Sequence, residues 1–253
     1  MDYDKEAKRL REVISDERRR KEVLRTTGEE AQEWLDLMQL LLERTGTHQG
    51  LRASIFKMML RLSRSAGLHP KCLTIQDVEV LGHHPVGGGA FGDVWKGRKG
   101  ESIVCLKVLR AFTAAEVEQA LKDYMQEAIV WRQLDHPNLL PFLGIYYMDD
   151  EDDDLRRVCL VSPWMERGNL VNFMKKNPEL VNTKSLAFDV ACGLSYLHDM
   201  KIVHGDLKGV RFGFYYFQML AQYLRSQLNI LITPDLRASI DKSFEGNNTV
   251  ACA

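Results

Sequence analysis

Residues 86–94 read Val86-Gly-Gly-Gly-Ala-Phe-Gly-Asp-Val94, and residues 104–107 read Val104-Cys-Leu-Lys107. The glycines have the spacing G-x-G-x-x-G, which on its own is a weak sign of a nucleotide site. A dinucleotide-binding turn would lead into a helix, but Asp93-Val-Trp-Lys96 continues as a strand. The pattern therefore predicts a hairpin that covers phosphates. Gly87, Gly89 and Gly92 would allow close backbone approach, and Val94 would cover an adenine ring.

The composition is that of an ordinary globular chain. Its 253 residues are 45% hydrophobic and 27% charged, which is enough for a sizeable core. A net charge of -1 gives no attraction to nucleic acid or to an anionic membrane. The longest apolar stretch, about 212–224, is too short and too polar to span a bilayer. Five scattered cysteines indicate free thiols in a reducing compartment. We therefore expect a cytoplasmic protein that binds neither nucleic acid nor membrane.

Residues 1–70 are predicted to form a helical N-terminal segment. Apolar side chains recur at helical spacing and indicate three helices, centred on residues 10–24, 34–42 and 51–62. Gly67, with Pro70 just beyond it, is expected to end the third helix. Acidic and basic residues alternate on the polar faces, which favours packing against the chain itself or a partner over a membrane surface.

From about residue 78 the pattern changes to strands and turns. Strands are predicted at 78–86, 90–96, 102–108, 140–147 and 158–161. One helix is expected to open at the capping box Thr113-Ala-Ala-Glu116 and to run to Leu134. The acidic run 149–154 is interpreted as a solvated hairpin tip, because it lacks the spacing of a calcium loop. Two further helices are predicted near 170–176 and 185–198.

Lys107 lies in an apolar strand, where a lone lysine is most often an edge residue that extends to water. Its position after the glycine hairpin and before a helix favours a second interpretation, in which a carboxylate from that helix pairs with it. Glu116, Glu118 and Glu127 are the candidates by distance, and Glu116 is better explained by capping.

Three longer stretches carry a resemblance to a known family. They read Glu127-Ala-Ile-Val-Trp-Arg-Gln-Leu-Asp-His-Pro-Asn138, Val158-Cys-Leu-Val-Ser-Pro-Trp-Met-Glu-Arg-Gly-Asn-Leu170 and His204-Gly-Asp-Leu-Lys-Gly209. In this order, after the glycine hairpin, they resemble protein kinases. Residues 72–232 look like the tyrosine-kinase-like group found in mushroom-forming fungi.

The resemblance implies an α+β fold. Residues 78–165 would form the kinase small lobe and hinge, an antiparallel sheet with one regulatory helix. Residues 166–240 would form an incomplete helical large lobe with an insertion at about 210–228. Residues 241–253 would be a tail outside the family pattern.

The resemblance also implies transfer of the ATP γ-phosphate, with Mg²⁺, to a protein hydroxyl. Asp206 would accept the proton of that hydroxyl, and Lys208 would steady the phosphoryl group and favour serine or threonine over tyrosine. Asn229 would hold magnesium. Glu127 would orient Lys107, and Ser162 would be the gatekeeper beside the adenine. The implied ATP-binding residues are Gly87, Gly89, Gly92, Val94, Cys105, Lys107, Glu127, Ser162, Met165 and Leu231.

The sequence departs from the family at two places. Asp206 and Asn229 are 23 positions apart, where the family has five, so we expect a disrupted magnesium site. Asp241-Lys-Ser-Phe-Glu245 stands where the family has Ala-Asp-Phe-Gly, so we expect the rest of the large lobe to be missing. Three interpretations remain open: a protein kinase, a pseudokinase-like binding module, and a mis-spliced product with a retained intron.

Overall fold

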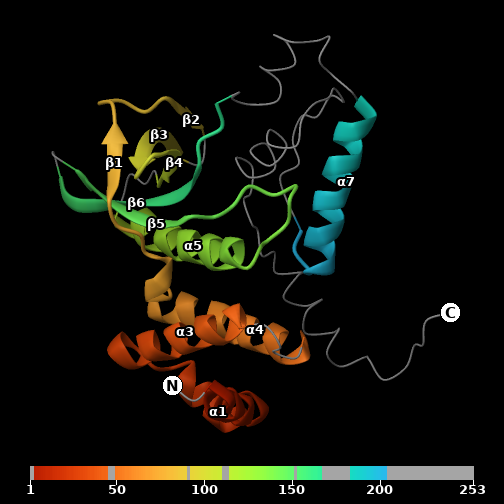
Figure 1. The fold of residues 1–253 in the computed structure, drawn as a ribbon. Helices are drawn as coiled ribbons and strands as arrows, with labels where there is room; N and C mark the ends of the chain where they lie inside the picture. Colours follow the sequence, from red (N-terminus) through yellow and green to blue (C-terminus); the bar gives the residue numbers. More distant parts are fainter. Residues whose placement is uncertain are drawn as a thin grey trace. The chain divides into compact units, whose positions relative to one another are not determined.

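The computed structural model describes residues 3–44, 49–89, 92–109, 114–150, 153–166 and 183–203. The chain divides into two units, Met1–Asp135 with Pro141–Trp164, and His136–Leu140 with Met165–Ala253. In the first unit, a helical segment precedes an antiparallel sheet that carries one helix (Figure 1). The predicted α+β class is confirmed.

Residues 3–66 form helices α1 (Tyr3–Ser15), α2 (Glu17–Val23), α3 (Gly28–Glu43) and α4 (Gln49–Ala66). The sequence predicts one helix where α1 and α2 lie. That prediction is wrong at Asp16, whose extended backbone and carboxylate start a new helix. The carboxylate accepts hydrogen bonds from the amides of Arg18 and Arg19, which are among the unpaired donors of a first helical turn.

The helical segment has a core of its own. Its apolar side chains recur at helical spacing, and the largest of them are fully buried: Leu10, Leu35, Met38, Leu41, Ile55, Met59 and Leu62. Gly67 ends α4 as predicted. It has a φ of 67°, and its amide and that of Leu68 both donate to the Ser63 carbonyl oxygen. A short 3-10 helix, η1 (Lys71–Leu73), then leads to the sheet.

Six strands form the sheet: β1 (Val78–Leu81), β2 (Gly87–Gly89), β3 (Gly92–Lys99), β4 (Ser102–Val108), β5 (Gly144–Asp150) and β6 (Asp153–Pro163). Their order is β1-β3-β4-β6-β5, and β2 pairs with β3. Every pair is antiparallel. Val104, Leu106 and Val108 alternate along β4 and are buried in the core of the sheet. Because successive side chains of a strand point to opposite faces, Cys105 and Lys107 lie on the other face.

Helix α5 (Ala114–Arg132) packs between α4 and strands β5 and β6 (Figure 1). Residues 124–131 are all buried, which is expected of a helix covered on more than one side. The predicted helix is thus confirmed, although Thr113 of the expected capping box lies outside the described residues. The acidic run spans the end of β5 and the start of β6, where Asp150 pairs with Asp153. This position agrees with the predicted hairpin.

The second unit contains α7 (Thr183–Asp199), close to the predicted helix at 185–198. Asn138 donates a hydrogen bond of 2.6 Å to the Asp189 carbonyl oxygen, and the His136 ring stacks on Tyr196. The helix predicted near 170–176 lies outside the described residues.

The described residues offer no helix that is both long and apolar enough to cross a membrane. The four cysteines that the structure describes, Cys72, Cys105, Cys159 and Cys192, are free thiols as expected.

Candidate functional site

A largely buried ion pair joins strand β4 to helix α5. The Lys107 ammonium lies 2.9 Å from Glu127 Oε1 and 3.3 Å from Oε2. The two side chains are 16% and 9% exposed. Burial raises the pKa of the Glu127 carboxyl, and the Lys107 ammonium opposes that rise. Buried ion pairs stabilise folds weakly or not at all, because both charges lose their water. A pair retained in such a place is therefore a candidate functional group.

The structure decides between two of the three glutamates that the sequence left open as partners of Lys107. Glu118 is exposed and lies 2.6 Å from Lys122 on its own helix, so it is excluded as the partner of Lys107. Glu127 is the described glutamate that contacts this lysine, with 2.9 Å between its Oε1 and Nζ. The Glu116 side chain lies outside the described part.

Tyr124 completes the surroundings of Lys107 and was missed by the sequence reasoning. The Lys107 Nζ lies 5.3 Å from the centre of the Tyr124 ring, within the range of a cation–π contact. Burial, with the nearby Glu127 charge, raises the pKa of Tyr124. The signal that could have revealed this residue is its position three residues before Glu127, which places both side chains on one face of α5.

The glycine hairpin lies beside the ion pair. Gly87 pairs with Val94 on β3, and Val94 pairs with Lys107 on β4. Neighbouring strands are about 4.8 Å apart, so Gly87 lies roughly 10 Å from Lys107 along this row. A side chain added at Gly87 would meet nothing within 4 Å, so the backbone there is open to a ligand.

Gly92 shows why the hairpin needs a glycine at its third position. Its φ is 146°, and an added Cβ would collide with the Val108 carbonyl oxygen. The same Cβ would lie 3.3 Å from the Tyr124 hydroxyl oxygen. The glycine thus brings the hairpin close to the strand and helix that carry the ion pair.

Cys105 and Ser162 extend the face of the sheet that carries Lys107. They are opposite each other in the pairing of β4 with β6, and residues opposite each other share a face. Ser162 is buried. Burial raises the pKa of the Cys105 thiol to about 11, although a hydrogen bond with Ser162 opposes the rise. This thiol is therefore protonated and unreactive at neutral pH.

The family model of protein tyrosine and serine/threonine kinases matches residues 81–210, about half of the chain. The chain belongs to this protein kinase family. The match begins at the end of β1 and includes every described residue of the site just described.

Curated kinases show the same likeness. The chain is 33% identical over 128 residues to the dual specificity protein kinase zakA of Dictyostelium discoideum, covering 48% of this chain and 16% of the relative. It is 31% identical over 148 residues to the ephrin type-A receptor 5 of Rattus norvegicus, covering 55% and 13%. It is 29% identical over 177 residues to LIM domain kinase 1 of Drosophila melanogaster, covering 64% and 13%. The chain therefore spans less than one fifth of the length of these relatives.

The structure brings together one part of the predicted kinase site. Gly87, Gly92, Val94, Cys105, Lys107, Glu127 and Ser162 lie on β2–β4, β6 and α5, and Gly89 ends β2. Met165 belongs to the second unit. The predicted catalytic residues Asp206 and Lys208, the magnesium ligand Asn229 and the ATP-binding Leu231 lie outside the described residues.

The residues present fit the phosphate end of ATP. Lys107 supplies a partly buried ammonium, and the open backbone at Gly87 lies in the same row of the sheet. Amides and ammonium groups are the usual partners of phosphate oxygens. Across the described ranges, no group of three or more His, Cys, Asp or Glu side chains could hold a metal ion. Asn229, the predicted magnesium ligand, is outside these ranges.

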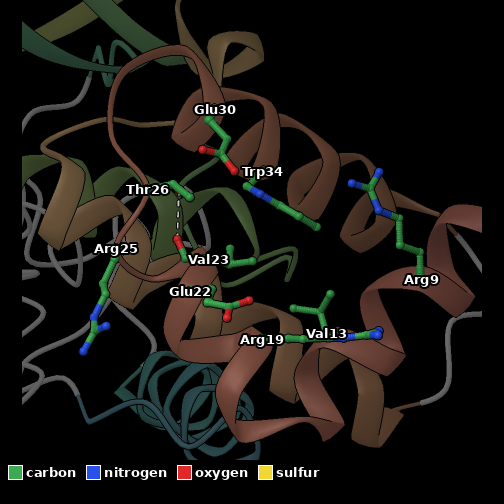
Figure 2. A pocket seen from close by; sticks show the side chains of 9 residues that line it. All are labelled: Arg9, Val13, Arg19, Glu22, Val23, Arg25, Thr26, Glu30 and Trp34. Carbon is green, nitrogen blue, oxygen red and sulfur yellow. Dashed lines mark hydrogen bonds between the residues drawn. The ribbon is translucent and has the colours of Figure 1, made fainter.

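A separate hollow of about 600 Å³ lies among α1, α2 and α3 (Figure 2). Its lining residues are Arg9, Val13, Arg19, Glu22, Val23, Arg25, Thr26, Glu30 and Trp34. Two of its charged side chains already have partners. Arg9 pairs with Glu6 and covers the Trp34 ring, and Glu22 pairs with Arg18. None of the predicted ATP-site residues lines it.

Proposed function

We propose that this chain binds ATP with magnesium and transfers the γ-phosphate to a serine or threonine hydroxyl of a protein. The observation that carries the proposal is the buried pair of Lys107 and Glu127 beside the glycine hairpin. A lysine held by a helix glutamate binds the phosphates in this family, which supports the proposal.

Each residue has a distinct role in the proposed reaction. Lys107 binds phosphate oxygens, and Glu127 fixes the direction of the ammonium. Asp206 accepts the proton of the substrate hydroxyl, and Lys208 steadies the phosphoryl group and favours serine and threonine. Asn229 holds magnesium, which supplies charge neutralisation at the phosphates when bound.

Two finer assignments belong to the same proposal. Its motifs support membership of the tyrosine-kinase-like group of mushroom-forming fungi, and its free cysteines support a location in the cytoplasm. Its near-zero net charge favours a protein partner over nucleic acid or an anionic membrane.

A second candidate function is ATP binding without phosphate transfer. The observation that favours it is the separation of 23 positions between Asp206 and Asn229. Chain entropy is a minor obstacle, because lengthening the connection about fivefold costs only about 1.5 kcal/mol. The harder requirement is steric, since the inserted segment carries Phe212, Phe214, Tyr215, Tyr216 and Phe217 into the catalytic loop.

Incubation with ATP labelled in its γ-phosphate and a mixture of Ser, Thr and Tyr peptides separates the two. Transfer to Ser and Thr peptides, reduced at least about 100-fold in Asp206→Asn, supports the kinase. Saturable ATP binding without transfer in the unchanged chain supports the binding module. A chain that neither binds nor transfers contradicts both.

A further inference from the structure

Helix α5 is fastened at its C-terminal end to the N-terminal helical segment. Arg132 donates two hydrogen bonds to Glu43 Oε1 on α3, at 3.0 Å from Nε and 2.6 Å from Nη2. The Gln133 amide donates a hydrogen bond of 2.8 Å to the Gln39 side-chain oxygen, also on α3. Gln39 is fully buried and donates in turn to Glu43. These four side chains form one connected network between the two helices.

A second attachment lies about two turns earlier in α5. The buried Gln126 side chain donates a hydrogen bond of 3.0 Å to the Leu60 carbonyl oxygen of α4. Arg64, one turn further along α4, lies 3.7 Å from Asp123. Helix α5 is thus held by both α3 and α4.

The attachment and the kinase site use different faces of the same helix. Successive residues of an α-helix are turned by about 100°, so the neighbours Gln126 and Glu127 point in different directions. Gln126 reaches α4, and Glu127 reaches Lys107. A rotation or outward movement of α5 that separates Glu127 from Lys107 would therefore also strain the contacts with α3 and α4.

The helical segment is in turn fixed to the sheet through its linker. Asp36 accepts a hydrogen bond of 2.6 Å from the Lys71 amide, and Gln32 donates one of 2.9 Å to the His69 carbonyl oxygen. The Ile75 amide then donates to the Ile145 carbonyl oxygen of β5. Helices α3 and α4 can therefore hold α5 in place relative to Lys107, because the helical segment that contains them is anchored to the sheet that carries this lysine.

From this double anchoring we propose that α3 and α4 act as an intramolecular clamp that positions Glu127 of α5 against Lys107. The clamp residues are Gln39, Glu43, Gln126, Arg132 and Gln133. They are positioning residues, since none touches Lys107. The effect on nucleotide rests on the proposed function, whereas the effect on α5 itself does not.

Charge reversal across the clamp tests this. Glu43→Arg places two cations together, and Arg132→Glu in the same chain restores an opposite-charge pair. The matched control is Glu79→Arg, which reverses one member of an exposed pair with Arg98 between β1 and β3. Gln126→Leu, which keeps the side-chain volume and removes the hydrogen bond to α4, is a second independent variant.

Amide hydrogen exchange of residues 124–131 in the full chain is the first readout, and the affinity for Mg-ATP is the second. We expect Glu43→Arg, which breaks a partly exposed ion pair, and Gln126→Leu, which removes one hydrogen bond, each to speed exchange in this stretch about threefold. Each should weaken the binding of Mg-ATP by a similar factor. The double charge reversal should restore both values, and Glu79→Arg should change neither.

Unchanged exchange at 124–131 in both single variants would overturn the clamp, as would a double variant that fails to recover. So would a uniform acceleration across the whole fold, because this is the mark of a merely structural role. If the unchanged chain does not bind Mg-ATP, the proposed function fails, while the exchange data still decide on the clamp.

Discussion

Lys107 and Glu127 meet across 20 positions of sequence, one on a strand and one on a helix, with their charged atoms 2.9 Å apart and nearly out of water. The pair connects the sheet, the helix and, through that helix, the N-terminal segment. Its position therefore depends on the whole first unit.

Removing one charge of the pair should destabilise the fold more than removing both charges together. Glu127→Leu leaves the Lys107 ammonium without its partner and should lower the free energy of unfolding by about 3 kcal/mol. Lys107→Met with Glu127→Leu removes both charges and should return to within about 1.5 kcal/mol of the unchanged chain. Urea denaturation measures both values.

The exposed pair of Glu79 and Arg98 is the matched control for this comparison. Glu79→Leu should cost less than about 1 kcal/mol, as usual for a pair in water. A double variant at 107 and 127 as unstable as Glu127→Leu alone would show that the two charges are not coupled.

Gly92 and Gly87 should respond differently to the same substitution. Gly92→Ala forces a Cβ against the Val108 carbonyl oxygen at a φ of 146°, so it should cost about 1–3 kcal/mol of unfolding free energy. Gly87→Ala adds a methyl group in open space and should change the stability by less than about 0.5 kcal/mol. Equal losses in the two variants would argue against the described path of the hairpin.

The pKa of His69 should make the stability of the first unit depend on pH. Burial lowers its pKa to about 4, and the nearby Asp36 charge opposes this. Its ring also contacts Thr74 and Tyr147. In the unfolded chain this histidine takes up a proton below about pH 6.5, whereas in the folded chain it does so only below about pH 4. Stability should therefore fall as the pH drops through this window, by about 2 kcal/mol between pH 7 and pH 5.

Urea denaturation at the two pH values, with His69→Gln for comparison, checks this dependence. The variant has no group to titrate at this position, so it should lose about 2 kcal/mol less than the unchanged chain over the same interval. Equal losses in both chains would mean that His69 is accessible to protons in the folded state.

Local patterns were sufficient to predict much of the small lobe. The alternation along 102–108 and the helical spacing up to Leu134 led to strand β4 and helix α5, and the motif order led to Glu127 as the partner of Lys107. These signals lie within short stretches of sequence, so one chain is enough to interpret them.

Two features needed the three-dimensional structure. The capping by Asp16 was missed, because a charged stretch continues through 11–22 and hides the break between α1 and α2. The contact of Gln126 with Leu60 joins residues 66 positions apart through a side chain and a backbone oxygen. A local sequence pattern cannot predict such a tertiary contact, because it depends on how the helices pack.

Calorimetric titration with Mg-ATP tests the central claim, that Lys107 binds the phosphates of ATP, most directly. The unchanged chain, the Lys107→Met/Glu127→Leu double variant and Lys122→Met, which removes an ammonium elsewhere on α5, are compared under the same conditions. Loss of a charge-assisted contact should weaken binding by about tenfold or more in the double variant and leave Lys122→Met unaffected. Equal affinity in all three chains, or no binding by the unchanged chain, would contradict the claim.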